Sequence, residues 1–127
     1  MTFAFSLVDR VLVALGALAG LAGVALSAAA AHRAGAGNLD TAARFLLLHA
    51  PVLIACAVLS ATALVPPWLG RAAGLVLLLG LVLFAGDLIH RVAREGGLFP
   101  MAAPAGGVLM MLGWGLIAIA ALVPVRG

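Results

Sequence analysis

Ionisable residues are scarce in this chain, and two of them fall deep inside long apolar runs. His49 follows Asp40 by nine residues and Asp87 precedes Glu95 by eight, so each lies about 12–13 Å along a helix from a polar end. An ionisable side chain inside a membrane helix costs about 2.5–3.5 kcal/mol on insertion scales, which makes each a candidate functional residue. Because their depths match on consecutive antiparallel helices, we expect His49 and Asp87 to make contact, and a site for a proton, an ion or a ligand is one interpretation of that contact.

A structural role for the same polar residues is the alternative. Asp87 and Arg91 have the four-residue spacing of a helical ion pair, and Glu95 extends the strip. Trp114 lies about 15 Å from Pro104, near the middle of the last apolar run, where its indole N–H needs an acceptor. We expect a backbone carbonyl there, with a ligand-lining role as the alternative. The candidate polar cluster comprises His32, Arg44, His49, Asp87, His90, Arg91 and Trp114.

Other chemical signatures are missing from the sequence. It has no nucleophile with a nearby base, no zinc-ligand spacing and no phosphate-binding glycine loop, so we expect no enzymatic activity, no metal site and no cofactor. Cys56 is the single cysteine and excludes an internal disulfide. A haem bound by His49 would need a second histidine at the same depth. The arginines sit singly at the ends of apolar runs, so the net charge of +3 does not indicate nucleic-acid binding.

The composition requires helices that lie in a membrane. The chain is 66% hydrophobic and only 9% charged, whereas soluble domains carry about 25% charged residues. Four apolar stretches approach the roughly 20 residues that cross a bilayer, at 8–31, 41–64, 69–91 and 105–123. Short connections favour antiparallel neighbours. We therefore predict an all-α, up-down four-helix transmembrane bundle, with residues 1–127 as a single membrane domain.

Local signals refine the predicted helices. Asp40 is expected to cap the second helix and to pair with Arg44, four residues later. The first stretch also resembles a cleaved signal peptide, but we expect it to be retained as a membrane helix. Glycines should allow close helix packing inside the bundle, with a homodimer face as the alternative. The predicted packing glycines are Gly16, Gly20, Gly23, Gly70, Gly74, Gly86, Gly106 and Gly107.

The orientation follows from the distribution of arginine. With four crossings, the face of the chain ends carries Asp9, Arg10, Arg71 and Arg126, and the opposite face carries four arginines. Pairing of Arg44 and Arg91 with carboxylates, together with the signal-like first helix, favours cytoplasmic termini. The near-even distribution is also compatible with insertion in both orientations.

Several motifs span most of the chain and resemble a known family. They are Ala31-His32, Thr41-Ala42-Ala43-Arg44-Phe45, His49-Ala50, Leu83-Phe84-Ala85-Gly86-Asp87-Leu88, Ala103-Pro104-Ala105-Gly106-Gly107 and Gly113-Trp114. In order and spacing they resemble the small bacterial membrane proteins of domain-of-unknown-function family 423, the YgdD-like proteins. The resemblance implies that motif positions are occupied by His32, His49, Gly86, Pro104, Gly106, Gly107 and Trp114. This chain departs from the family pattern at Asp87, where a small polar residue is more usual.

Three classes of function remain open. The first is a non-catalytic accessory or assembly partner of a larger complex in the bacterial inner membrane, where its partners would be the lipid bilayer and another membrane protein, or a second copy. The second is a small transporter or channel, which requires a hydrated cavity at His49. The third is a module that binds a quinone, a haem or an anionic lipid headgroup near Arg33, Arg44, Arg91 and Arg94.

Overall fold

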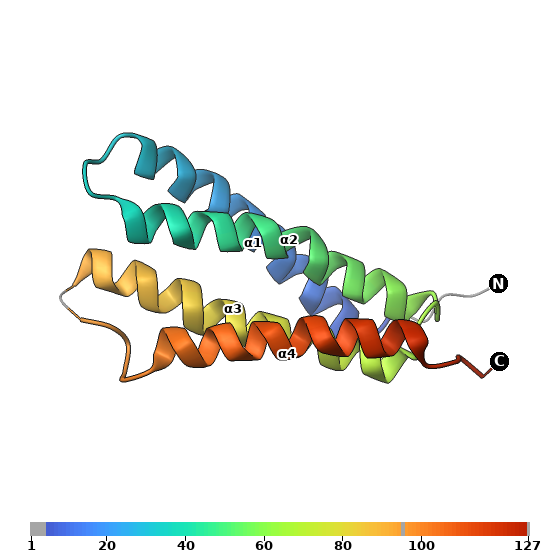
Figure 1. Cartoon of the computed structure of the whole chain (residues 1–127). Helices are drawn as coiled ribbons and strands as arrows, with labels where there is room; N and C mark the ends of the chain where they lie inside the picture. The colour runs from blue at the N-terminus through green and yellow to red at the C-terminus, as the bar shows by residue number, and fades with distance from the viewer. Residues whose placement is uncertain (1–4, 95, 127) are drawn as a thin grey trace.

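Four helices make up nearly all of the protein. The computed structural model describes residues 5–94 and 96–126, which form α1 (Leu7–Ala31), α2 (Gly37–Ala61), α3 (Pro67–Ala93) and α4 (Ala102–Leu122). Each helix is long and apolar enough to cross a bilayer. Consecutive helices run in opposite directions, so the start of α1 and the end of α4 lie at one end of the molecule (Figure 1). The prediction of an all-α protein with four membrane helices is confirmed.

The helix ends differ from the predicted ones by a few residues. α2 begins at Gly37, so Asp40 lies in its first turn, and the N-cap position is taken by Ala36 without a side-chain hydrogen bond. The prediction that Asp40 caps this helix is therefore wrong: its carboxylate accepts a hydrogen bond from Arg44 Nε at 2.9 Å instead. α4 begins at Ala102 because Pro104 falls in the first turn, where the missing N–H of proline breaks no helical hydrogen bond.

The helices pack in chain order. α1 lies along α2, α2 along α3, and α3 along α4, whereas α1 touches α3 only over a short stretch. In the most hydrophobic 18-residue stretch of each helix, 39% of the residues are buried in α2 and α3, but only 22% in α1 and α4. The outer helices therefore offer most of their surface to lipid. The α1–α2 hairpin lies close to the α3–α4 hairpin at the end with the chain termini and diverges from it toward the connecting loops (Figure 1).

The core combines leucines with close backbone contacts. Leu12, Leu53, Leu77 and Leu81 are almost completely buried. α3 and α4 approach so closely that a Cβ added to Gly106 would lie 2.6 Å from the carbonyl oxygen of Gly80. Gly80 was not among the glycines predicted to pack. Inside a membrane such small-residue contacts hold helices together, because lipid is as apolar as the side chains.

The predicted packing glycines differ in their surroundings. An added Cβ would crowd a neighbouring helix or the residues just before α3 at four of these positions: Gly16, Gly23, Gly70 and Gly74. Added to Gly20 or Gly86, it would make only ordinary contact, and at Gly107 it would meet nothing within 4 Å. The role predicted for Gly107 in close helix packing is therefore wrong, because no atom of another helix comes within 4 Å of the position of its missing Cβ. Gly113, which packs against Leu77, takes part instead.

Candidate functional site

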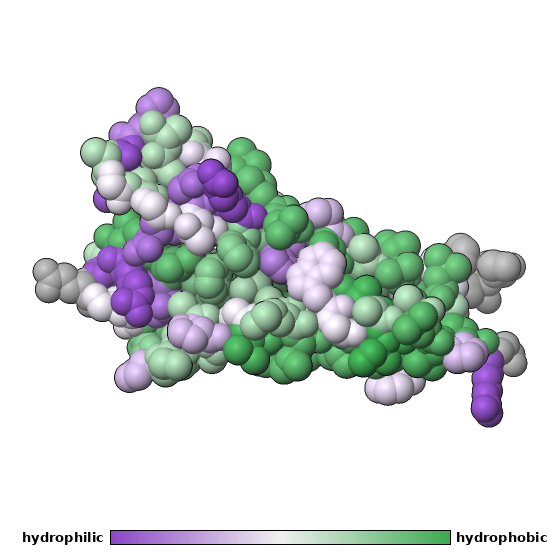
Figure 2. Space-filling view, viewed as in Figure 1, coloured by the Kyte–Doolittle hydropathy of each residue, from purple (hydrophilic) through white to green (hydrophobic). Residues whose placement is uncertain are grey.

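The residues of the predicted polar cluster separate into distinct groups. His32 caps the end of α1 and is exposed. The pair of Arg44 and Asp40 is also exposed, with 78% and 46% of the side chains accessible. Hydrophilic surface gathers mainly at the loop end of the molecule, while hydrophobic surface covers most of the rest of this face (Figure 2). Of the predicted cluster, the deep residues form two separate sites, one around His49 and one around Asp87.

A hydrogen bond joins the side chain of His49 on α2 to that of Trp114 on α4. The indole N–H of Trp114 donates to Nε2 of His49 at 3.2 Å, and Nδ1–H of His49 donates to the carbonyl of Phe45 at 2.9 Å. Because an indole can only donate, Nε2 must carry a lone pair, and the ring is neutral with its proton on Nδ1. Trp114 therefore uses a histidine, and not the expected carbonyl, as its acceptor. His49 is 2% exposed, and its ring packs against Phe45 and Trp114. Phe84 packs in turn on Phe45.

Asp87 anchors the α3–α4 connection. Its fully buried carboxylate accepts from the backbone N–H of Leu98 at 2.7 Å and from Arg91 Nε at 3.0 Å. Gly97 leaves room for this contact, because a Cβ there would collide with the carboxylate. His90 adds a hydrogen bond from Nδ1 to the carbonyl of Gly96.

The predicted contact between His49 and Asp87 is not formed. Each side chain forms its hydrogen bonds with other partners. His49 bonds with Phe45 and Trp114, and Asp87 with Arg91 and the backbone of the α3–α4 loop. Glu95, the second expected partner of Arg91, lies outside the described residues. Asp87 thus holds a loop against the end of α3, which agrees with the structural alternative.

A buried ion pair at the opposite end of the bundle was missed by the sequence reading. Asp9 is 0% exposed and receives hydrogen bonds from Arg71 Nε at 2.9 Å and Nη2 at 2.8 Å, a two-point contact between α1 and α3. Asp9 also accepts from the backbone N–H of Ser6, whose hydroxyl accepts from the N–H of Asp9, a reciprocal capping box. The Ser-x-x-Asp spacing was a readable signal for the cap, but nothing in the sequence marked Arg71 as its partner.

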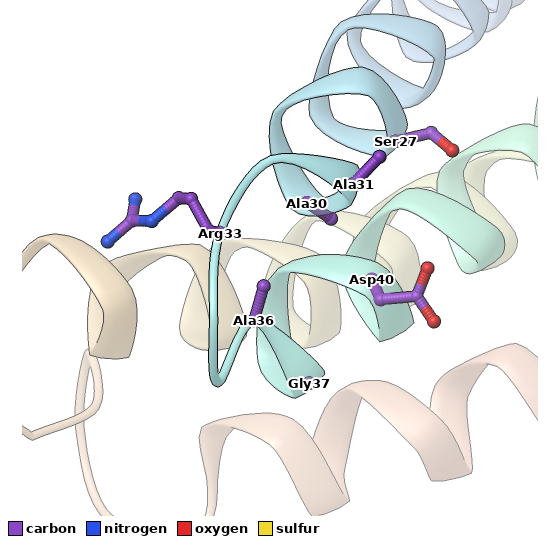
Figure 3. A pocket seen from close by; sticks show the side chains of 7 residues that line it. All are labelled: Ser27, Ala30, Ala31, Arg33, Ala36, Gly37 and Asp40. Carbon is purple, nitrogen blue, oxygen red and sulfur yellow. The ribbon is translucent and has the colours of Figure 1, made fainter.

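Hollows on the surface are mostly apolar. One of about 370 Å³ lies between α2 and α4 beside His49 and Trp114, and one of about 420 Å³ lies along α4 around Gly115. A third, also about 420 Å³, lies at the α1–α2 connection, where Arg33 and Asp40 extend in opposite directions (Figure 3). Asp40 already binds Arg44, so this loop hollow gathers no set of free polar groups. Among residues 5–94 and 96–126, no three His, Cys, Asp or Glu side chains converge to hold a metal ion.

The fold and these sites define a small helical membrane protein whose buried polar groups are paired with one another. In residues 5–94 and 96–126, no buried side-chain nitrogen or oxygen lacks a hydrogen-bond partner. A family model described as "Protein of unknown function (DUF423)" matches residues 15–107, and the chain belongs to this family. The match includes His49, Asp87 and Gly106, and it ends before Trp114. No solved structure matches the chain.

Proposed function

We propose that this protein is a non-catalytic assembly partner, which binds a transmembrane helix of another membrane protein along the outer face of α4. The observation that carries this proposal is Gly115, which lies at the surface with nothing within 4 Å of the position of its missing Cβ. Gly115 belongs to an apolar hollow of about 420 Å³ on α3 and α4. The hollow is lined by Val76, Leu109, Met111, Leu112, Gly115, Leu116 and Ile119.

Two other glycines of α4 show how such a residue can be used in this protein. Gly106 and Gly113 each admit a neighbouring helix at a distance that no side chain would allow. A glycine within a helix is about 0.5–1 kcal/mol less favourable than alanine, so a lipid-facing glycine without a packing role has a cost and no gain. In a membrane, close backbone approach is the main use of such a residue. Gly115 would allow such a close approach, but no helix of the described residues lies against it.

The transport alternative has less support. A proton or ion pathway needs hydrated polar groups, and His49 is packed among aromatic side chains with both ring nitrogens bonded. The carboxylate of Asp87 likewise accepts hydrogen bonds from the side chain of Arg91 and the backbone N–H of Leu98. These contacts favour a structural role for both residues.

We further propose that the protein resides in the bacterial inner membrane with both termini in the cytoplasm. Arg44, Arg71 and Arg91 are ion-paired, which leaves Arg10 and Arg126 at the terminal end against Arg33 and Arg94 at the loop end. Since these numbers are equal, the proposal rests on α1, whose N-terminal arginine followed by a long apolar run is typical of a helix inserted with its N-terminus inside.

Thiol labelling tests the orientation. A membrane-impermeant maleimide added to intact cells should modify an Asn38→Cys variant and leave a Val125→Cys variant unmodified until the membrane is opened. The native Cys56 is buried within α2 and serves as the unlabelled background. Labelling of Val125→Cys alone, or of both variants, would contradict the proposed orientation.

Site-specific crosslinking tests the α4 interface. A photoreactive residue in place of Leu112, at the hollow, should yield a discrete adduct with another membrane protein after irradiation of intact cells. The same residue in place of Leu21, which is exposed on α1, should yield none. Gly115→Leu should abolish the adduct, while Ala25→Leu on α1 should leave it unchanged. An adduct of twice the chain's own mass would replace the proposed partner with a second copy, and equal adducts at both positions would refute the interface.

A further inference from the structure

A second groove, which shares only Met111 with the lining of the Gly115 hollow, lies between α2 and α4 with α3 beneath it. Its volume is about 370 Å³. The lining residues are Phe45, Leu48, His49, Phe84, Gly107, Met110, Met111 and Trp114. His49 is at the middle of α2 and Trp114 at the middle of α4, so the groove opens toward the hydrocarbon near half the depth of the membrane.

The groove contains one hydrogen-bond donor and one strong acceptor on its side chains. These are the indole N–H of Trp114 and Nε2 of His49, which bond to each other at 3.2 Å. That distance is at the long end of the usual range for an N–H donor. The remaining side chains of the lining are hydrocarbon or thioether. The orientation of the His49 ring is fixed, because its Nδ1–H is held by the carbonyl of Phe45, whereas the indole of Trp114 is partly exposed.

We infer that this groove binds a lipid-soluble molecule carrying a hydroxyl group, an alcohol or phenol with a hydrocarbon body. The indole of Trp114, which is partly exposed, moves away from His49 to admit the hydroxyl, which then accepts from the indole N–H and donates to Nε2 of His49. Two hydrogen bonds then replace one, and a hydroxyl group finds partners at a depth where water offers none.

The same geometry disfavours other polar groups. A ketone, a quinone carbonyl or an ether can accept from Trp114, but it leaves Nε2 of His49 without a donor. A site with a buried unpaired acceptor rejects such analogues strongly, as sites built around a hydroxyl do. Gly107 has nothing within 4 Å of its missing Cβ, so its lack of a side chain keeps the groove open. This inference does not depend on the proposed interface at Gly115.

Quenching of Trp114 fluorescence by matched probes tests the inference. In a Trp68→Phe background, Trp114 is the single tryptophan, and a bromine atom on a bound probe quenches its emission. The probes are 3-bromo-5-octylphenol, its methyl ether and 1-bromo-3-octylbenzene, which all carry the bromine on the ring that bears the hydroxyl in the phenol, titrated into the protein in lipid nanodiscs. We expect the phenol to reach half-maximal quenching at a mole fraction about tenfold lower than the ether or the hydrocarbon, the factor that corresponds to one net hydrogen bond.

Three variants assign the effect to the groove. His49→Phe should abolish the preference for the phenol over its methyl ether, and Gly107→Leu should abolish saturable quenching by all three probes. Gly115→Leu, outside this groove, should bind the phenol as the parent does. Equal half-maximal quenching by the three probes would overturn the inference, because the groove would then take any hydrocarbon chain. The comparison of probes needs no change at His49, so the test stands even if His49→Phe does not fold.

Discussion

Substituting Arg71 by Met should lower the thermal unfolding midpoint of the purified protein more than any other exchange of a single charged residue. The substitution leaves the 0%-exposed carboxylate of Asp9 without its two-point partner, and only the backbone N–H of Ser6 continues to donate to it. Removing one member of a buried ion pair typically costs about 3–5 kcal/mol, because the remaining charge stays buried and uncompensated. The unfolding midpoint in mild detergent, followed by size-exclusion fluorescence, measures the loss.

Two variants separate the ion pair from a general effect of arginine. Arg10→Met makes the same chemical change at an exposed side chain next to Asp9 in the sequence, and it should shift the midpoint little. The double variant Asp9→Leu with Arg71→Met removes both charges and should recover most of the stability, since a well-packed apolar pair often matches a buried ion pair. A double variant no more stable than Arg71→Met would show that unpaired charge is not the cause.

Substituting Gly106 by Ala should separate α3 from α4. The added methyl carbon would lie 2.6 Å from both the carbonyl oxygen of Gly80 and the backbone nitrogen of Phe84. Extra methyl groups in a packed core cost about 1–3 kcal/mol when side chains can move aside. Here the obstacle is the backbone of α3, which cannot move aside as a side chain can, so we expect a loss at the upper end of that range. The unfolding midpoint and the emission of Trp114 in the Trp68→Phe background report it together, since moving α4 disturbs the bond to His49.

The neighbouring residue supplies the control. Gly107→Ala is the same substitution one position along the helix, with no atom within 4 Å of the added carbon. It should leave the midpoint unchanged or raise it slightly, because alanine favours a helix more than glycine does. If both variants are equally stable, the close approach of Gly80 and Gly106 is not a constraint on the fold.

Features that depend on neighbours in the sequence were predictable. The four spans follow from apolar runs of sufficient length, and the Asp40–Arg44 and Asp87–Arg91 pairs follow from the four-residue spacing. The depth of His49 was also readable, because position along a helix converts directly into distance along its axis.

Features that depend on which helix faces meet were not predictable. Depth alone could not tell that His49 faces Trp114 on α4 and not Asp87 on α3, because a rotation of α2 about its axis changes the partner without changing depth. For the same reason Gly107 was given the wrong role and Gly80 was given none, although both lie in helices that were correctly placed. The short connections fixed the order of neighbours but left these rotations free.

The bond between Asp9 and Arg71 has a consequence for how the protein is made. The two residues are 62 positions apart, so the ribosome must synthesise α2 and the start of α3 before Asp9 can meet its counterion. Until then the carboxylate of Asp9, in the first turn of α1, has no counterion, and the contact between α1 and α3 that buries it cannot form. We therefore expect the first hairpin to stay at the insertion machinery, or at the bilayer surface, until the third helix arrives, so that the four helices are released into the membrane as one unit.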